Sequence, residues 1–348
     1  MSIAGGQRRV VGGRVNIGIV GAGGIAKAYA DLLPSSNTAT CVGVADINID
    51  AAVTMAAGLG CPSFASVDGL AGLDGLEAVV LCTPPVTHVV LAERFADIGV
   101  HVLSEKPLAV NRHAAAEMAA IAERGGVVVT MATKFRFCND VNRAALIQSS
   151  GRIGEVRLVE NGFTSRVDMG GRWNSDRAIS GGGVLVDNGT HSVDLIRYLL
   201  GPIAEVLAVE TSRPGDFAVD DTCRLHLRTE AGTDAHVDLS WSIDKSLADF
   251  LRIYGTLGEI RVGWRESAWR LHGGEWEIIG SGYAKGPAMG GALDAFCLAV
   301  RGEAPLVVTV DDGIAAATCI DAAYESLRRG GWVKLAELTL DDLEVSPR

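Results

Sequence analysis

The chain has 348 residues, enough for two domains, and 48 % of them are hydrophobic while only 5 % are aromatic. Small aliphatic side chains and 43 glycines favour closely packed layers of helix and sheet over an aromatic-rich barrel. A net charge of −11 argues against a nucleic-acid partner and against an anionic membrane surface.

The N-terminal residues 1–13 carry two arginines but no apolar segment after them, so we expect a disordered leader and no signal peptide. No apolar run approaches the ~20 residues that a membrane helix needs, and no membrane partner is expected. The seven cysteines are scattered, odd in number and without Cys-x-x-Cys spacing. This usage is typical of reduced thiols and predicts a cytoplasmic protein.

Residues 14–134 alternate short apolar runs with helical patterns. Such alternation predicts right-handed βαβ units around a parallel sheet, the α/β architecture of a dinucleotide-binding domain. The expected strands are 15–20, 40–45, 78–82, 100–103 and 127–130, and the expected helices are 25–33, 49–58, 87–98 and 112–124.

A glycine-rich turn, Gly21-Ala22-Gly23-Gly24-Ile25-Ala26, follows the first expected strand and opens the first expected helix. Gly21 permits the tight turn, Gly23 lets the backbone approach a pyrophosphate, and Ala26 keeps the helix close to the strand. The free N–H groups of the helix N-terminus, at Gly24 and Ile25, suit phosphate binding. A merely structural glycine turn is the alternative, but the full strand–turn–helix context favours a dinucleotide site.

An acid, Asp46, ends the second expected strand, twenty residues after Ala26. A carboxylate there can accept hydrogen bonds from the adenosine ribose and repels a 2′-phosphate. Residues 47–50 contain no arginine or lysine to bind that phosphate. We therefore expect NAD, with NADP the less favoured cofactor, although an N-cap for the next helix is compatible with the same position.

Two further loops, Thr83-Pro84-Pro85 with His88 and Glu105-Lys106-Pro107, follow later strands of the first domain. Ligands of parallel sheets bind beyond the carboxyl ends of the strands, so we expect both loops beside the glycine turn. Lys106 could donate a hydrogen bond to a substrate oxygen or relay its proton. A solvated surface lysine is the alternative, but the adjacent proline fixes where the side chain points.

Residues 135–348 show a different pattern, in which most predicted strands follow one another directly. Consecutive strands without intervening helices predict an open antiparallel sheet that could wall off a substrate. The expected strands are 155–161, 204–211, 222–228, 233–242, 250–254 and 259–262, and the expected helices are 191–200, 292–301 and 313–329.

A glycine triplet, Gly181-Gly182-Gly183, precedes Asp187, Asn188 and His191. If a helix begins near Asp187, then Asp187 and His191 share one of its faces. A carboxylate beside an imidazole orients the ring and raises its basicity, which suits a general acid/base near neutral pH. The glycines would let backbone or substrate approach closely. The alternative is a helix N-terminus capped by Asp187, with His191 as an ordinary helical residue.

Two other histidines, His226 and His236, flank an expected hairpin turn near Asp238, so a metal is conceivable there. The pairing register is uncertain and no third histidine lies nearby in the sequence. We therefore expect no metal site.

Together these stretches resemble the glucose–fructose oxidoreductase / inositol dehydrogenase / MocA family (Gfo/Idh/MocA) of sugar and polyol dehydrogenases. The resemblance spans residues 14 to 335 approximately and rests on Gly21–Ala26, Thr83–Pro85 with His88, Glu105–Leu108, Gly181–His191, Tyr324–Ser326 and Gly330–Val333. It implies a Rossmann domain followed by an α+β domain with an open, mainly antiparallel sheet, through which members often form homodimers or homotetramers.

The resemblance also assigns residues to roles. Lys106 would hydrogen-bond the reacting hydroxyl, Asp187 would position the substrate and the imidazole, and His191 would be the general acid/base. The implied cofactor contacts are Gly21, Gly23, Gly24, Ile25, Ala26, Asp46, Thr83, Pro84, His88, Glu105 and Lys106. The implied substrate contacts are Arg136, which could also touch the cofactor, Asn188, and Trp173 with its neighbours Asn174 and Asp176.

These roles imply an NAD-dependent oxidoreductase that moves a hydride between nicotinamide and a secondary hydroxyl or keto group of a sugar, cyclitol or nucleotide-linked sugar. One alternative is a regulator of the same fold that binds NAD(P) without turnover. Another is a glycosidase that oxidises its substrate transiently. Net redox change of the cofactor during turnover would distinguish the dehydrogenase from the glycosidase, and NADH binding without turnover would favour the regulator.

Overall fold

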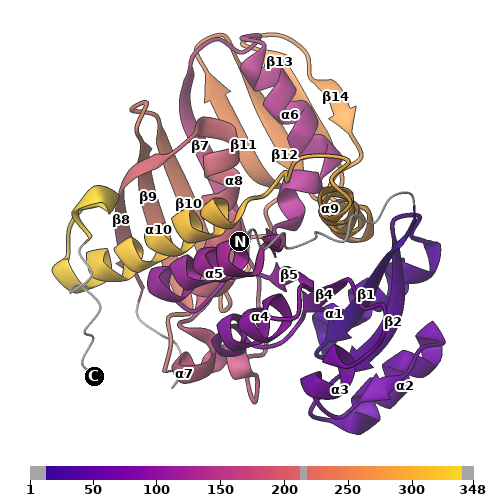
Figure 1. Cartoon of the computed structure of the whole chain (residues 1–348). Coiled ribbons are helices and arrows are strands. Elements are labelled where there is room, and N and C mark those ends of the chain that lie inside the picture. The colour runs from indigo at the N-terminus through magenta and orange to yellow at the C-terminus, as the bar shows by residue number, and fades with distance from the viewer. Residues whose placement is uncertain (1–12, 212–217, 339–348) are drawn as a thin grey trace, which may run out of the picture. The chain divides into compact units, whose positions relative to one another are not determined.

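A computed structural model describes residues 13–211 and 218–338 (Figure 1). The expected leader, residues 1–13, lies outside the described residues except for Gly13. The described chain forms two compact units. The first contains residues 13–109, 113–134 and 289–314, and the second contains residues 110–112, 135–288 and 315–338.

The first unit contains a six-stranded parallel sheet in the order β3-β2-β1-β4-β5-β6. Its strands are β1 (Val15–Val20), β2 (Ala39–Ala45), β3 (Ser63–Phe64), β4 (Ala78–Leu81), β5 (His101–Glu105) and β6 (Val129–Ala132). Its helices α1 to α5 are Gly24–Leu32, Ile49–Leu59, Val67–Ala71, His88–Ala96 and Arg112–Gly125. This is the Rossmann strand order, whose ligand crevice lies at the carboxyl ends of the strands.

The expected strands and helices of this unit are confirmed, with their ends within two residues. Two short elements, β3 and α3, were not predicted because so few residues give no readable periodicity. All four residues of β4 and five of the six residues of β1 are buried, as expected for strands covered on both faces.

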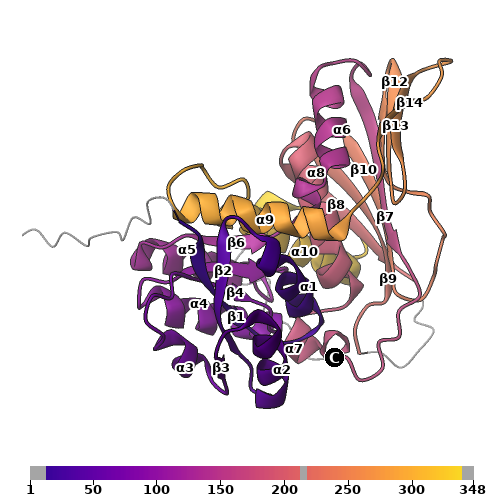
Figure 2. The same cartoon turned by 90° about the vertical axis from the view of Figure 1, so that its right-hand side faces the viewer.

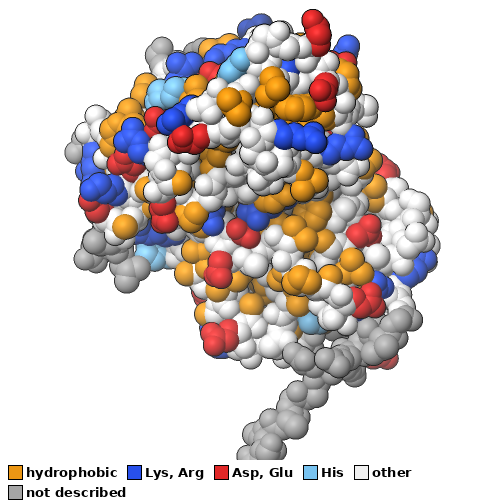
Figure 3. Space-filling view, turned by 90° about the horizontal axis from the view of Figure 1, so that it is seen from above, with side chains coloured by type: hydrophobic (Ala, Val, Ile, Leu, Met, Phe, Trp, Pro, Cys, Tyr) orange, Lys and Arg blue, Asp and Glu red, His pale blue; other side chains and the backbone are white. Residues whose placement is uncertain are grey.

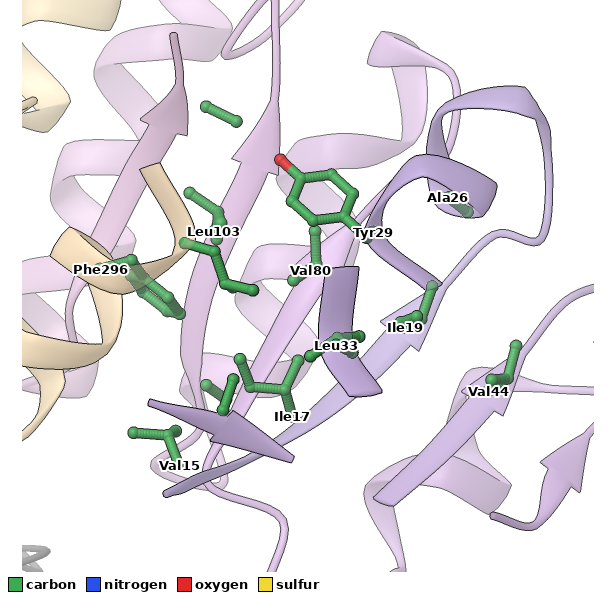
Figure 4. Packing of buried hydrophobic residues seen from close by; sticks show 14 of the residues in the cluster. Val15, Ile17, Ile19, Ala26, Tyr29, Leu33, Val44, Val80, Leu103 and Phe296 are labelled. Atoms are coloured by element: carbon green, nitrogen blue, oxygen red, sulfur yellow. The ribbon is translucent and has the colours of Figure 1, made fainter. Parts of the chain in front are cut away.

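The core of this unit lies between β1 and the helices packed on it (Figure 4). Ile17, Ile19 and the ring of Tyr29 are inaccessible or nearly so. Phe296 joins them from α9 (Lys285–Val300), whose residues from Met289 onward belong to this unit. The sequence predicted this helix only from residue 292, because glycines and Pro287 obscure its first turns.

The second unit contains a nine-stranded sheet in the order β14-β13-β12-β11-β7-β10-β9-β8-β15. Strands β7 to β15 are Val156–Thr164, Ile203–Glu210, Thr222–Thr229, Asp234–Ser240, Asp249–Gly255, Gly258–Gly263, Ser267–Leu271, Glu277–Gly280 and Val333–Lys334. The mainly antiparallel sheet is confirmed, with one correction. β7 and β10 run parallel, because the chain leaves β7 for a long helical excursion before the hairpins β8–β9–β10 return beside it.

One face of this sheet is covered by helices (Figures 1 and 2). They include α6 (Asn139–Ser149) and α8 (Thr190–Leu200), which contact the sheet, and α10 (Val310–Arg329), whose Ser326 hydroxyl accepts the N–H of Ala208 on β8. Side chains alternate along β9, where Leu225 and Leu227 are buried while Arg224 is exposed. The polar residues of β9 therefore lie on the opposite face.

The surface in Figure 3 carries Lys and Arg side chains interspersed with Asp and Glu rather than gathered by sign. Within residues 13–211 and 218–338, the structure contains no helix with the length and apolar composition to cross a membrane.

Candidate functional site

The glycine turn between β1 and α1 has the geometry that its sequence predicts. Gly21 has a φ of +92°, and a Cβ there would lie 2.8 Å from the carbonyl oxygen of Cys82. A Cβ at Gly23 or Gly24 would meet no protein atom within 4 Å. The start of α1 has neither a side-chain cap nor an acidic residue in its first turn. Gly21 is thus needed for the turn itself, while the open helix start suits an anionic ligand.

Asp46 fixes this turn to the end of β2. Its Oδ2 accepts the N–H of Ala22 at 2.5 Å, and its Oδ1 accepts the N–H of Asn48 at 2.7 Å. The N-cap of α2 is Asn48, whose side chain accepts the N–H of Ala51, so the N-cap alternative for Asp46 is wrong. With one lone pair used on each oxygen, the carboxylate can still accept ribose hydroxyls.

His88 is fully buried and bonded to the protein, and its predicted contact with the cofactor stays a prediction. Its Nε2 lies 2.9 Å from the carbonyl oxygen of Thr83, and its Nδ1 lies 3.0 Å from the hydroxyl of Ser104. Nδ1 also lies 3.1 and 3.2 Å from the carbonyl oxygens of Pro107 and Leu108, and burial lowers the pKa of His88. His88 therefore fixes the loop after β4 to the end of β5.

Glu105 and Lys106 lie at the carboxyl end of β5, where Glu105 is buried and Lys106 is half-buried. The Tyr29 hydroxyl donates to Oε1 of Glu105 at 2.9 Å, and the backbone N–H of Lys106 donates to Oε2 at 3.2 Å. Burial raises the pKa of Glu105, and the Lys106 and Lys134 ammonium groups oppose that rise. Sequence analysis missed Tyr29, because a tyrosine in an apolar helix face is indistinguishable from an ordinary core residue.

The segment with Asp187 and His191 departs from the expected helix start. A π-helical turn, Leu185–Gly189, carries Asp187 and Asn188, and α8 begins only at Thr190. Asp187 caps neither segment, because their N-cap residues are Val184 and Gly189. Asp187 and Asn188 are half-buried, and His191 is 7 % exposed in the first turn of α8.

Asp220, which sequence analysis did not select, stabilises this turn from the segment before β9. Its carboxylate accepts the N–H of Gly183 at 3.0 Å, the N–H of Leu185 at 2.8 Å and the hydroxyl of Tyr324 at 2.6 Å. Its carbonyl oxygen accepts the N–H of Val184. Burial and the Asp220 charge raise the pKa of Tyr324 well above its ordinary value, so the phenol stays a donor.

The glycine triplet makes this arrangement possible. A Cβ at Gly182 would overlap the hydroxyl of Tyr324, and one at Gly183 would overlap the carbonyl oxygen of Asp220. Gly181 has a φ of +83° and passes close to the backbone of Val110. The groups that approach the three glycines closely are thus the backbone of other segments and the hydroxyl of Tyr324.

His191 lies at one end of an aromatic cluster. Its ring stands edge-on to Phe135, with centroids 5.1 Å apart and planes at 82°, and it also contacts Phe163. The cluster continues through Phe250, Tyr283 and Trp264. These contacts restrict how the imidazole can turn.

Arg136, predicted to contact cofactor or substrate, forms a buried ion pair, and that predicted contact stays a prediction. Its Nε and Nη2 donate to the carboxylate of Asp194 on α8, at distances of 2.7 to 3.1 Å. The two side chains are 6 % and 1 % exposed. The guanidinium also lies 5.5 Å from the ring centroid of Tyr198. Arg136 is thus joined to two residues of α8, and Asp194 is more than an ordinary polar residue of that helix.

The expected substrate residues differ in exposure. Trp173 is 40 % exposed, and the amide of Asn188 donates to the carbonyl of Phe163 at 3.5 Å. Asp176 caps the short helix α7 (Arg177–Ser180) by accepting the N–H of Ala178. Substrate contact by Trp173 and Asn188 stays a prediction.

His226 and His236 pair directly across β9 and β10, with ring centroids 4.7 Å apart. They line a hollow of about 510 Å³ on the sheet together with Asp238 and Arg224. No cluster of three or more His, Cys, Asp or Glu side chains suited to a metal occurs among residues 13–211 and 218–338. All seven cysteines are free thiols.

Comparison with known proteins gives two family matches. Residues 15–133 match the oxidoreductase family with an NAD-binding Rossmann fold, and residues 141–261 match the GFO/IDH/MocA C-terminal domain. The chain is 26 % identical over 339 residues to inositol 2-dehydrogenase of Rhizobium meliloti (strain 1021), covering 92 % of this chain and 99 % of that protein.

Two further relatives extend the comparison. D-xylose 1-dehydrogenase (NADP(+)) 2 of Haloferax volcanii is 29 % identical over 288 residues, or 80 % of this chain and 86 % of the relative. The crystal structure of GenD2 from gentamicin A biosynthesis in complex with NAD is 26 % identical, with a TM-score of 0.82 over 96 % of this chain and 99 % of that one. With family matches on both its parallel-sheet and its mainly antiparallel-sheet segments, the chain belongs to the Gfo/Idh/MocA family of oxidoreductases.

Proposed function

We propose that the protein is an NAD-dependent dehydrogenase that moves a hydride between nicotinamide and a secondary hydroxyl or keto group of a sugar, cyclitol or nucleotide-linked sugar. The observation that carries the proposal is the turn that presents Asp187 and His191. Asp220, Tyr324 and the glycine triplet fix that turn through buried contacts. A chain that only bound NAD would have no chemical need for an acid and an imidazole fixed in this way.

The glycine turn fits a dinucleotide. The backbone of Gly23, Gly24 and Ile25 at the open start of α1 would bind the pyrophosphate, and Asp46 would accept the adenosine ribose hydroxyls. Thr83, Pro84 and Glu105 at the ends of β4 and β5 would lie toward the nicotinamide. When bound, NAD accepts or supplies the hydride at its nicotinamide ring.

The choice of NAD over NADP rests on Asp46. Two backbone N–H groups fix its carboxylate at the end of β2, where it would repel a 2′-phosphate. The next residue, Ile47, is 99 % exposed and carries no charge to offset that repulsion. The NADP(+)-linked name of the Haloferax relative makes the cofactor preference of this chain worth measuring directly.

We assign proton transfer to His191, oriented by Asp187 and by the aromatic cluster that begins at Phe135. An imidazole titrates near neutral pH, whereas the ordinary pKa of a lysine is ~10.4. Lys106 is therefore assigned the electrostatic role of donating a hydrogen bond to the reacting oxygen. Trp173 and Asn188 are proposed to contact the rest of the substrate.

The predicted homodimer or homotetramer and the cytoplasmic location remain proposals. The resemblance implies association through the large sheet, and the face of that sheet with Arg224, His226 and His236 is the surface an oligomer would use. Sedimentation velocity of the purified chain over a range of concentrations tests this. A monomer at every concentration would contradict it.

A dehydrogenase screen that follows NADH absorbance, with polyols, free sugars and nucleotide sugars as substrates, tests the proposed function. His191→Ala and Lys106→Ala should each lower turnover by about 100-fold or more, the scale of lost acid/base help, and leave NADH binding nearly intact. Arg94→Ala and Arg124→Ala, whose side chains form exposed ion pairs in the first unit, are controls that should turn over normally. Normal rates in His191→Ala would refute the role of His191, and NADH binding without turnover on any substrate would favour the regulator.

A further inference from the structure

Two of the free cysteines of this chain are in contact within the first unit. Cys41 belongs to β2, and Cys61 lies between α2 and β3. Their Sγ atoms are 3.7 Å apart, and both residues are half-buried, so solvent reaches each of them. A disulfide bond holds its two sulfurs at about 2.05 Å, so these thiols are a short movement away from that geometry.

Backbone hydrogen bonds fix the two cysteines beside each other. Cys41 belongs to the parallel ladder between β1 and β2. The N–H of Cys61 donates to the carbonyl oxygen of Ala56 on α2 at 3.2 Å, and the N–H of Val44 on β2 donates to the carbonyl oxygen of Pro62 at 3.1 Å. The fold itself therefore brings the two thiols together.

The two thiols differ in how readily they ionise. Burial and the neighbouring Cys61 raise the pKa of Cys41 to about 12. Burial also raises the pKa of Cys61, but a hydrogen bond from the Cys41 thiol opposes that rise. The thiolate is the attacking form of a cysteine, so Cys61 is the readier nucleophile and Cys41 is placed to react second.

We propose that Cys41 and Cys61 are a redox-responsive pair, which a small disulfide oxidant such as glutathione disulfide converts to an intramolecular disulfide. The Cys61 thiolate attacks one sulfur of the oxidant, whose S–S bond breaks and releases one thiol. The Cys41 thiolate then attacks Sγ of Cys61, the mixed disulfide breaks, and the second thiol leaves. The protein gives up two electrons and two protons, and the oxidant takes them up as its two thiols.

The new bond would close residues 41–61 into a loop that contains α2 and the proposed ribose acid, Asp46. Such a cross-link reduces the freedom of the unfolded chain and so favours the folded one. We expect oxidation to raise the midpoint of thermal unfolding by about 5 °C. Dithiothreitol should reverse the rise by returning both thiols.

Peptide mapping of the full chain tests the pairing directly. The folded protein is incubated with glutathione disulfide, its remaining thiols are blocked with N-ethylmaleimide, and it is digested without reduction. Endoproteinase Asp-N cleaves before aspartates and separates the three half-buried cysteines into the peptides 31–45, 50–67 and 74–96. Wild type should give peptide 31–45 linked to peptide 50–67 as its main disulfide product.

Three variants test the order of events. Cys41→Ser removes the thiol that reacts second, so Cys61 should remain a mixed disulfide with glutathione. Cys61→Ser removes the attacking thiol, so Cys41 should remain free, and neither variant should become more heat-stable on oxidation. Cys82→Ser is the matched control, because it removes the other half-buried thiol and should give the same linked peptides as wild type.

The chain unfolded in urea is the reference, because all its thiols are then accessible and the linked peptides should be spread over many pairs. Cys41 and Cys61 that are both recovered with N-ethylmaleimide in folded wild type, while the unfolded chain oxidises, would overturn the inference. Linked pairs as varied in the folded protein as in the unfolded chain would overturn it too, because the fold would then not direct the pairing.

Discussion

The two units of this chain hold their candidate residues in opposite ways. In the first unit they lie on turns directly after strands, and backbone conformation and backbone hydrogen bonds place them, as at Gly21 and Asp46. In the second unit, Asp187 and His191 depend on buried polar side chains from distant segments, above all Asp220, Tyr324 and Arg136. Substitutions in the first unit should therefore alter cofactor preference, whereas substitutions in the second unit should lower stability and turnover together.

The largest expected effect comes from breaking the buried ion pair of the second unit. Arg136→Met leaves the Asp194 carboxylate buried without its bidentate partner, which should lower the free energy of unfolding by about 3–5 kcal/mol. Urea denaturation followed by circular dichroism measures this. The double variant Arg136→Met/Asp194→Leu should recover much of the loss, because no charge is then left unpaired.

The matched control lies in the first unit, where Arg94 and Asp68 form an exposed ion pair with side chains 40 % and 73 % exposed. Arg94→Met should cost under about 1 kcal/mol. Equal losses in Arg94→Met and Arg136→Met would show that the contrast between the units is wrong.

A second buried acid in the second unit, Asp321, should make the stability of the protein depend on pH. Burial raises the pKa of Asp321 from its ordinary 3.8 to about 6, while the backbone N–H of Arg112 donates to it at 2.9 Å. Between about pH 4 and 6 the folded chain binds the extra proton, so the contribution of Asp321 to stability falls as pH rises and is lowest above 6. Asp321→Asn keeps an oxygen acceptor for Arg112 and removes the charge.

Relative to Asp321→Asn, wild type should therefore gain about 2–3 kcal/mol in the free energy of unfolding between pH 7 and pH 4. Urea titrations of both proteins at these two pH values give the difference. A difference that stays constant with pH would show that Asp321 ionises normally in the folded chain.

Removing the charge that stabilises the π-helical turn should have a smaller effect. In Asp220→Asn an amide group replaces one of the oxygens that accept the N–H groups of Gly183 and Leu185, so one of these N–H groups loses its partner. We expect a loss of about 2 kcal/mol in stability and a roughly tenfold lower kcat. The Kd for NADH, measured by fluorescence, should stay within about twofold. Tyr324→Phe keeps both Asp220 oxygens and removes the hydroxyl that donates to Asp220 and accepts from the N–H of Gly183, so it should show a similar stability loss.

If Asp220→Asn weakened NADH binding as much as turnover, the hydrogen bonds of Asp220 would affect cofactor binding as well as the residues Asp187 and His191. Weakened turnover alone would support the separation between the two units.

The same contrast explains what the sequence could predict. The strands of the parallel sheet and the glycine turn could be located because each depends on neighbours within a few residues, and Asp46 because it follows the glycine turn at the spacing of a dinucleotide-binding motif. Asp220, Arg136 and Tyr29 could not be assigned, because their partners lie 35 or more positions away in the chain. The burial of His88 was not predicted for the same reason, since it depends on the loop after β5. The parallel pairing of β7 with β10 likewise follows from a long helical excursion that periodicity does not reveal.

The smallest expected effect tests the first unit's local character at Asp46. Asp46→Ser removes the charge that would repel a 2′-phosphate and shortens the acceptor for the ribose hydroxyls, so NAD should bind less well and NADP relatively better. We expect the ratio of the two Kd values to change by about tenfold, or ~1.4 kcal/mol. Stability should change by less, because only the N–H groups of Ala22 and Asn48 lose a partner near the surface. Asp50→Ser, in the first turn of α2, is the control for a lost charge nearby. Fluorescence titrations with NADH and NADPH give the ratio. An unchanged preference in Asp46→Ser would show that Asp46 fixes the turn but does not contact the ribose hydroxyls of the cofactor.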